Sequence, residues 1–192
     1  QSSTLPDGTV VGVRHDAVDA AGRAAALRAT VVGAGLARPG TGRAALYRIA
    51  AENGLDPFFS DEVLAETAAI TSRQSLDDAG LEDLEALAFV TIDGAMSRDL
   101  DQALYVERAT RGSGYVVHYA LADAAHFVPR GSALFAQSLA RGTSYYLPGF
   151  SVPMLPRPLS EGLVSLNPDV PRRALVFTVE LDGAGERVSA RV

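Results

Sequence analysis

The sequence predicts an α+β fold, in which a helical N-terminal region is followed by a mixed or antiparallel sheet. Residues 16–37 are rich in alanine and carry apolar residues at helical spacing, whereas from residue 88 onward short apolar runs alternate with turn signals. Glycine-rich stretches at residues 111–114 and 182–185 are typical of turns between antiparallel strands. With 192 residues, 47% of them hydrophobic, the chain can bury a sizeable core.

The first half of the chain predicts mainly helices. A turn at residues 5–9 precedes a short strand at 10–13, and the helical pattern of 16–37 ends at Pro39 and Gly40. A second helix is expected over 43–53 with Gly54 at its end, and a third from an N-cap at Ser60 to about Ile70. Residues 71–85 are polar and acidic, with one short helix expected at 81–87.

The second half predicts strands with one further helix. Strands are expected at 88–92, 103–106 and 115–121, and a helix over 133–141 that ends at Gly142. An aromatic strand at 143–147 is followed by a proline-rich segment, 148–158, which we expect to be extended because proline cannot donate to a sheet interior. A final hairpin is expected from strands at 174–181 and 187–192.

The composition excludes several classes of site. The chain has no cysteine, which excludes disulfides, thiolate metal sites and a cysteine nucleophile. The net charge of -6 argues mildly against a broad phosphate-binding surface, and all 17 basic residues are arginines, which suit bidentate phosphate contacts. No stretch resembles a secretory signal or a membrane span, so a cytoplasmic protein is expected.

Three carboxylates crowd the short polar loop at residues 91–103. Asp99 and Asp101 would point to the same side of an extended backbone, and Asp93 would join them if the loop folds back. Such an oxygen site suits Mg²⁺ or Mn²⁺. A solvated acidic turn is the simpler alternative, while an EF-hand is not supported because its glycine and closing glutamate are missing at the required offsets.

This loop resembles the signature of the ribonuclease II and ribonuclease R family of exoribonucleases, known as the RNB domain. The likeness runs from about residue 59 to 192, and further blocks follow in the family's order. These blocks are Phe59 to Glu66, Tyr119 to Val128, Gly131 to Leu134, Arg141 to Pro148, Pro153 to Pro156, Leu159-Ser160 and Ser165 to Pro168. The resemblance implies that residues 59–192 form the N-terminal half of an RNB ribonuclease domain with its lead-in segment, preceded by a helical region at 1–58 of uncertain role.

The resemblance also implies an activity and its cofactor. It implies a Mg²⁺-dependent 3′-to-5′ exoribonuclease that hydrolyses single-stranded RNA to nucleoside 5′-monophosphates with two ions, Mn²⁺ being a possible substitute. Asp101, Asp99 and Asp93 would be catalytic through the metal, with Gln102 as a peripheral ligand where family members usually carry a fourth aspartate. That amide brings no charge, so a non-catalytic RNA-binding or regulatory relative is the alternative.

The remaining expectations concern RNA and the rest of the domain. Tyr146 is expected to stack on a base, although a core aromatic is an equal reading without the resemblance, and Arg141 and Arg157 are weaker candidates for phosphate contact. His118 and His126 are interpreted as structural, and Asp123 as either a cap or a carboxylate near the metal. The later half of the domain, in the same or another chain, would be a partner, and the 192-residue chain alone is expected to be inactive.

Overall fold

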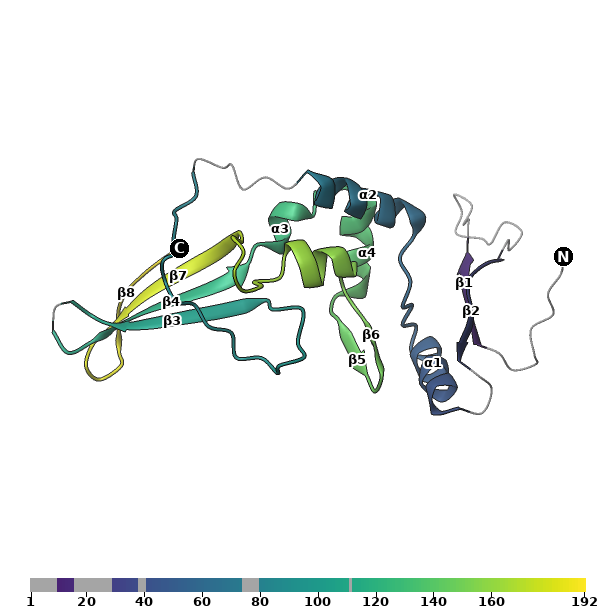
Figure 1. The fold of residues 1–192 in the computed structure, drawn as a ribbon, viewed down its shortest axis with the longest axis horizontal. Coiled ribbons are helices and arrows are strands. Elements are labelled where there is room, and N and C mark those ends of the chain that lie inside the picture. The colour runs from purple at the N-terminus through teal and green to yellow at the C-terminus, as the bar shows by residue number, and fades with distance from the viewer. Residues whose placement is uncertain (1–9, 16–28, 38–40, 74–79, 111) are drawn as a thin grey trace. The chain divides into compact units, whose positions relative to one another are not determined.

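The computed structural model describes residues 10–15, 29–37, 41–73, 80–110 and 112–192 (Figure 1). They form helices and antiparallel strands, so the predicted α+β class is confirmed. The chain divides into two compact units, the first made of Gln1–Asp61 and Thr143–Pro153, and the second of Glu62–Gly142 and Met154–Val192. In the described part of the chain, no helix is long and apolar enough to cross a membrane.

A β-hairpin opens the first unit. Strands β1 (Val10–His15) and β2 (Ala29–Ala37) pair antiparallel, which confirms the short strand expected at residues 10–13. The helix expected over 16–37 is wrong for 29–37, and residues 16–28 and 5–9 lie outside the described residues. The ladder with β1 overrides the helix propensity of alanine, and the glycines at 33 and 35 weaken a helix there.

Helix α1 (Gly42–Glu52) matches the second predicted helix closely. The Thr41 side chain accepts a hydrogen bond from the Ala44 N–H at its start, and Gly54 after its end has a φ of 68°. The ring of Tyr47 stacks on that of Phe150, with centroids 4.5 Å apart. This contact joins α1 to the small hairpin of the same unit.

That hairpin pairs β5 (Tyr145–Leu147) with β6 (Phe150–Val152), so the aromatic strand is confirmed over its last three residues. The proline-rich segment was expected to be extended, but it is not extended throughout. Pro148 and Gly149 form the turn of this hairpin, and Gly149 takes a φ of 87°. In the second unit, Pro158 begins η1 (Pro158–Leu163), a π-helix. Proline fits a first helical turn because the N–H that it lacks would have no partner there.

The second unit is built around a four-stranded antiparallel sheet in the order β3-β4-β7-β8 (Figure 1). Its strands are β3 (Gln102–Arg108), β4 (Tyr115–Ala122), β7 (Ala174–Leu181) and β8 (Arg187–Arg191). The strands expected at 103–106, 115–121, 174–181 and 187–192 are confirmed to within a few residues. At 88–92 the structure has only an isolated bridge from Val90 to Leu104 in place of a strand.

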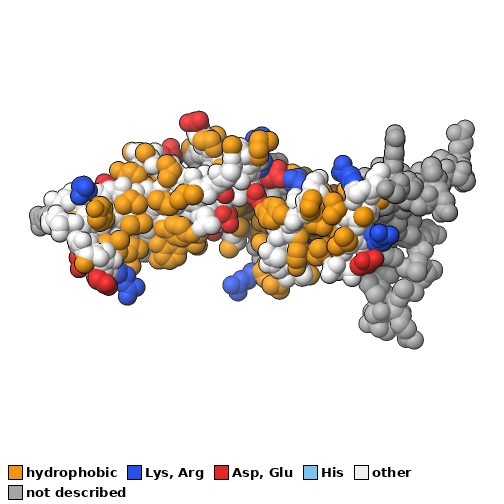
Figure 2. Space-filling model, turned by 90° about the horizontal axis from the view of Figure 1, so that it is seen from below, with side chains coloured by type: hydrophobic (Ala, Val, Ile, Leu, Met, Phe, Trp, Pro, Cys, Tyr) orange, Lys and Arg blue, Asp and Glu red, His pale blue; other side chains and the backbone are white. Residues whose placement is uncertain are grey.

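The two faces of this sheet differ in burial. Alternation places Ala103, His118, Ala120 and Thr178 on one face, where all four are buried; we call it the inner face. The opposite, open face carries mostly apolar side chains, namely Leu104, Val106, Val117, Tyr119, Leu175 and Phe177. Of these, Val106 and Leu175 are 46% and 47% exposed. Figure 2 shows hydrophobic side chains gathered over the part of the second unit that holds this sheet.

Three α-helices accompany the sheet and η1 in this unit: α2 (Asp61–Ser72), α3 (Ala124–Phe127) and α4 (Ala133–Arg141) (Figure 1). Helix α4 has the predicted bounds, with Ser132 accepting from the Phe135 N–H at its start and Gly142 at its end. Leu134 at the start of α4 and Leu159 in η1 are fully buried. These side chains form the centre of the core.

Glu66 of α2 binds the first turn of α4. Its two carboxylate oxygens accept hydrogen bonds from the backbone N–H groups of Ala133 and Leu134, at 3.1 and 2.7 Å. Helix N-termini carry unpaired N–H groups and partial positive charge, so this carboxylate satisfies two donors and fixes α2 against α4.

We expect Glu66→Ala to lower the free energy of unfolding by about 1–2 kcal/mol, because two N–H donors lose a charged acceptor. Denaturant unfolding followed by circular dichroism measures this. The control is Glu62→Ala, an exposed residue of the same helix, for which about 0.5 kcal/mol or less is expected. Equal losses in the two variants would contradict this role of Glu66.

The helix expected at residues 81–87 is wrong, because residues 81–84 are irregular and residues 85–87 form a turn and a bend. The Asp83 carboxylate accepts from the Glu85 N–H at 2.9 Å, a local bond that competes with helix formation. Glu82 pairs with Arg191 of β8 at 3.0 Å, and this hydrogen bond and charge lower the pKa of Glu82. Sequence-distant contacts therefore hold the segment that leads into the acidic loop.

Candidate active site

The acidic loop is closed at its base by backbone pairing. Val90 and Leu104 exchange two hydrogen bonds of 2.9 Å, so the chain from 91 to 103 leaves the sheet edge and returns to it. Within the loop, the Ser97 N–H donates to the Gly94 carbonyl at 2.9 Å and forms a turn. The excursion thus folds back, as the convergence of its carboxylates requires.

The carboxylates themselves are not gathered into a metal site. Asp93 and Asp101 are exposed and Asp99 is half-buried. Over the described residues, no group of three or more His, Asp or Glu side chains is close enough to hold a metal ion. The assignment of Asp93, Asp99 and Asp101 as metal ligands therefore stays a prediction that rests on the loop's position and on the chemistry of its donors.

Gln102 is directed to the side of the sheet opposite Asp101. The Asp101 carbonyl accepts from the Ala122 N–H at 2.9 Å, which continues the ladder, so the side chains at 101 and 102 point to opposite faces. On the open face, the Tyr119 hydroxyl donates to Gln102 Oε1. The amide oxygen expected to be a peripheral ligand is thus bound by a tyrosine, and Gln102 stays a predicted ligand only.

The backbone around Asp99 and Asp101 is held by hydrogen bonds from Ser165 and Leu166. The Ser165 hydroxyl accepts from the Leu100 N–H at 2.9 Å and donates to the Arg98 carbonyl at 2.8 Å. The Leu166 N–H donates to the Leu100 carbonyl at 2.8 Å. The segment Ser165-Leu166, which follows η1, therefore holds the end of the acidic loop.

Two further side chains hold this segment in turn. Arg172 donates from Nε to the Ser165 carbonyl at 2.9 Å and from Nη2 to the Gly162 carbonyl at 3.2 Å, and burial lowers the pKa of Arg172. The Asn167 amide donates to the carbonyls of Glu161 and Gly162 at 3.1 and 3.4 Å. Sequence reasoning noted the block Ser165 to Pro168 but missed its role, which only spatial contact shows.

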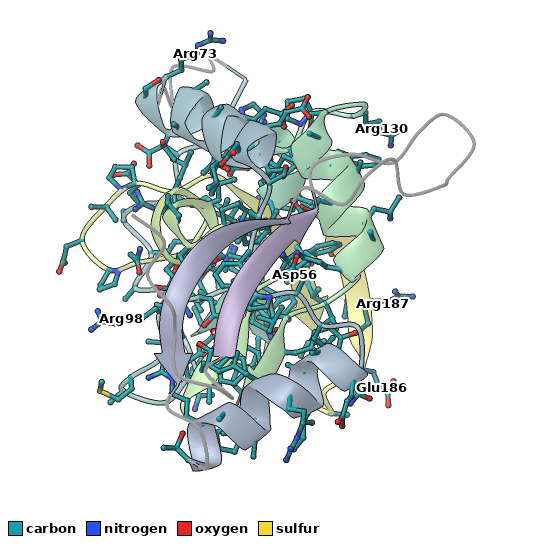
Figure 3. The ribbon with its side chains drawn as sticks, turned by 90° about the vertical axis from the view of Figure 1, so that its right-hand side faces the viewer. Asp56, Arg73, Arg98, Arg130, Glu186 and Arg187 are labelled. Carbon is teal, nitrogen blue, oxygen red and sulfur yellow. The ribbon has the colours of Figure 1, made fainter. Side chains whose placement is uncertain are left out.

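A cavity of about 830 Å³ adjoins the loop. Its lining includes Asp93 and Arg98 of the loop, Ala103 and Ala120 of the inner face, and Arg172. Arg98 is exposed, and in Figure 3 its side chain points away from the body of the protein. One side of the acidic loop thus opens onto a space that is large enough for a small ligand.

The Asp123 carboxylate makes two contacts within the fold. One of its oxygens accepts from the His126 N–H at 3.2 Å and caps α3, while the other accepts from Arg173 Nε at 2.8 Å. Both partners of this ion pair are largely buried, with exposed side-chain fractions of 12% for Asp123 and 18% for Arg173. Of the two readings, the structure favours the cap.

His118 lies on the inner face, 7% exposed, within 3.4 Å of Thr178 Oγ1 and 3.6 Å of a Glu107 carboxylate oxygen. Its Nε2 makes no hydrogen bond within the described part of the chain. The ring of His126 in α3 contacts Phe127 edge-on. These contacts agree with structural roles for both histidines.

The residues expected to touch RNA fall in different units. Tyr146 in β5 belongs to the first unit and is 69% exposed, which does not suit a core aromatic. Arg141 ends α4 in the second unit and is half-buried. Arg157, also in the second unit, forms an ion pair with Glu161, so a phosphate would have to compete with that carboxylate.

Comparison with known proteins gives consistent matches. The family model described as RNB domain matches residues 81–192. The chain is 42% identical over 139 residues to Ribonuclease R of Acidithiobacillus ferrooxidans, covering 72% of this chain and 31% of that protein. It is 44% identical over 122 residues to Exoribonuclease 2 of Erwinia tasmaniensis, covering 62% of this chain and 19% of that protein.

Solved structures agree. RNase R of Mycoplasma genitalium in complex with double-stranded RNA matches with a TM-score of 0.75 at 29% identity, over 100% of this chain and 33% of that one. The same protein in complex with ribose-methylated single-stranded RNA matches with a TM-score of 0.76 at 29% identity, over 100% of this chain and 29% of that one. The chain thus spans a third or less of the length of these relatives.

Proposed function

Because the chain belongs to the RNB-domain family of exoribonucleases, we propose that it is part of a Mg²⁺-dependent 3′-to-5′ exoribonuclease that degrades single-stranded RNA to nucleoside 5′-monophosphates. The observation that carries this proposal is the backbone clamp on Asp99 and Asp101 inside the region that matches the family. A solvated acidic turn would not need its peptide groups held by a buried serine.

The donors available fit the proposed metal. Asp93, Asp99 and Asp101 supply carboxylate oxygens, the ligands that Mg²⁺ and Mn²⁺ prefer. When bound, two such ions would supply an activated water and would stabilise the departing 3′-oxygen. Gln102 would join as a peripheral ligand only by turning from the open face, where its amide oxygen accepts from Tyr119, to the side of Asp101.

The rest of the catalytic domain is a proposed partner, in the same or another chain. Support comes from the share of the relatives that this chain spans, which is 31% for Ribonuclease R of Acidithiobacillus ferrooxidans. On this proposal the 192-residue chain alone is inactive, and robust RNA shortening by the purified chain would contradict it. We place the activity in the cytoplasm, where single-stranded RNA is available.

A second function is favoured by one observation. Gln102 replaces a carboxylate expected from the resemblance, and Tyr119 binds its amide oxygen, so the centre could belong to a non-catalytic RNA-binding or regulatory relative. The full-length parent, given a 5′-labelled single-stranded oligoribonucleotide with Mg²⁺ or Mn²⁺, separates the two functions. Stepwise shortening from the 3′ end is expected, whereas binding without shortening would refute the enzyme and support the second function.

We expect Tyr146→Ala to weaken binding of single-stranded RNA by the full-length parent about tenfold, because stacking on one base contributes about 1–3 kcal/mol. Fluorescence anisotropy with a labelled oligoribonucleotide measures this. The matched control is Tyr145→Ala on the opposite face of the same strand, where the side chain is 38% exposed, against 69% for Tyr146. Equal weakening by both variants would indicate that the hairpin, and not a stacked base, determines the loss.

A further inference from the structure

We propose that Ser165 is a positioning residue that fixes the backbone at Asp99 and Asp101, and with it the directions in which these two side chains leave the chain at the proposed metal centre. This inference rests on the proposed function, since it assigns a role to Ser165 at the same metal centre. Ser165 is 65 residues beyond Leu100 in the sequence and 1% exposed. Its place in the fold, and not its place in the sequence, brings it to the loop.

The two hydrogen bonds of the Ser165 hydroxyl hold the peptide groups on both sides of Asp99. The Arg98 carbonyl belongs to the peptide group before Asp99, and the Leu100 N–H belongs to the one after it. Because each peptide group is planar, fixing both leaves the φ and ψ of Asp99 little freedom. One hydroxyl therefore sets the direction in which the Asp99 side chain leaves the backbone.

The same holds for Asp101, with backbone donors. The Leu100 carbonyl, before Asp101, accepts from the Leu166 N–H at 2.8 Å, and the Asp101 carbonyl, after it, accepts from the Ala122 N–H at 2.9 Å. Leu166 is the neighbour of Ser165, so a shift at Ser165 would move this contact as well. Next to Asp93, by contrast, the backbone forms the turn from Gly94 to Ser97.

The number of hydrogen bonds that the Ser165 hydroxyl can donate and accept agrees with these assignments. A serine hydroxyl has one proton to donate, and the Arg98 carbonyl at 2.8 Å is nearer than the Asn167 amide oxygen at 3.2 Å. The lone pairs remain for the Leu100 N–H. Alanine at 165 would leave this N–H and the Arg98 carbonyl without their partner, although the backbone bond from Leu166 would remain.

Metal ligands depend on the groups that orient them, and losing such a group typically weakens metal binding about 10–100-fold. In the full-length parent we therefore expect Ser165→Ala to raise the Kd for Mn²⁺, measured by electron paramagnetic resonance, at least about tenfold. The matched control is Ser138→Ala, which removes another buried serine hydroxyl, one in α4 without a hydrogen-bond partner in the described part of the chain. Its Kd is expected to stay that of the wild type.

Hydrogen exchange provides a readout that needs neither metal nor activity. The Leu100 amide is expected to exchange faster in Ser165→Ala than in the wild type and at the wild-type rate in Ser138→Ala. If Ser165→Ala does not fold, Ser165→Cys keeps nearly the same shape with a weaker donor and acceptor. Unchanged Leu100 exchange and Mn²⁺ affinity in a folded position-165 variant would overturn the role of Ser165, whereas a wild type that binds no Mn²⁺ and shortens no RNA would overturn the proposed function.

Discussion

Asp101→Asn is expected to lower RNA degradation by the full-length parent by about a thousandfold, because a metal ion supplies several kcal/mol of transition-state stabilisation and each 1.36 kcal/mol is a factor of ten in rate. The substitution replaces a charged oxygen by a neutral amide of the same size. The backbone bonds of residues 100 and 101 do not involve this side chain, so the loop should keep its path. RNA binding is therefore expected to change little.

Shortening of labelled RNA and anisotropy with the same oligoribonucleotide measure the two quantities for Asp101→Asn. The control is Asp56→Asn, an exposed aspartate outside the cavity lining, whose hydrogen bond from the Phe58 N–H an asparagine oxygen also accepts. It is expected to keep wild-type activity. If Asp101→Asn lost binding and activity equally, Asp101 would support the fold and not the chemistry.

Gly114→Ala is expected to destabilise the second unit by about 3 kcal/mol or more, because a backbone atom occupies the space of the new methyl group. A Cβ at residue 114 would lie 2.0 Å from the Leu181 carbonyl oxygen and 3.2 Å from the Asp182 Cα. Residues 114 and 181 lie where β4 and β7 begin their pairing, so the clash cannot be relieved by rotating a side chain. The strands would have to separate there.

Thermal and denaturant unfolding of Gly114→Ala measure this loss. Gly162→Ala is the control, since a Cβ at 162 meets nothing within 4 Å, and little change is expected. Gly183→Ala is expected to be intermediate, because its nearest contact, at 2.3 Å, is the Ser113 hydroxyl, which can rotate away. A Gly114→Ala protein as stable as Gly162→Ala would contradict the close approach of these two strands.

Local sequence signals were sufficient for the helices whose ends carry clear capping residues. Helix α4 has the bounds that the sequence predicts, because Ser132 caps its start and Gly142 ends it with a φ of 70°. They failed where pairing partners decide the outcome. Residues 29–37 have many alanines but form β2, because β1 satisfies their backbone groups in a ladder. The short helix expected at 81–87 does not form, since the Asp83 carboxylate accepts a local hydrogen bond from the Glu85 N–H and Glu82 pairs with the distant Arg191.

For the candidate site, sequence reasoning located the acidic loop but not what holds it. The bonds from Ser165 to Arg98 and Leu100 join residues 67 and 65 positions apart, and no periodicity or spacing indicates such contacts. The alternation of side chains along a strand predicts that Asp99 and Asp101 point to the same side. The same alternation also applies to Gln102. It places the Gln102 amide on the opposite face of the sheet, where the Tyr119 hydroxyl donates a hydrogen bond to the amide oxygen.

The open face of the four-stranded sheet affects how readily copies of the chain associate in solution. Its apolar side chains, with Val106 and Leu175 nearly half exposed, favour contact between copies of the chain when they meet in solution. The net charge of -6 opposes such contact, and this repulsion shrinks as carboxylates take up protons at lower pH or as salt screens them. Dilute, mildly alkaline, low-salt buffer is therefore the condition in which the 192-residue chain should stay dispersed.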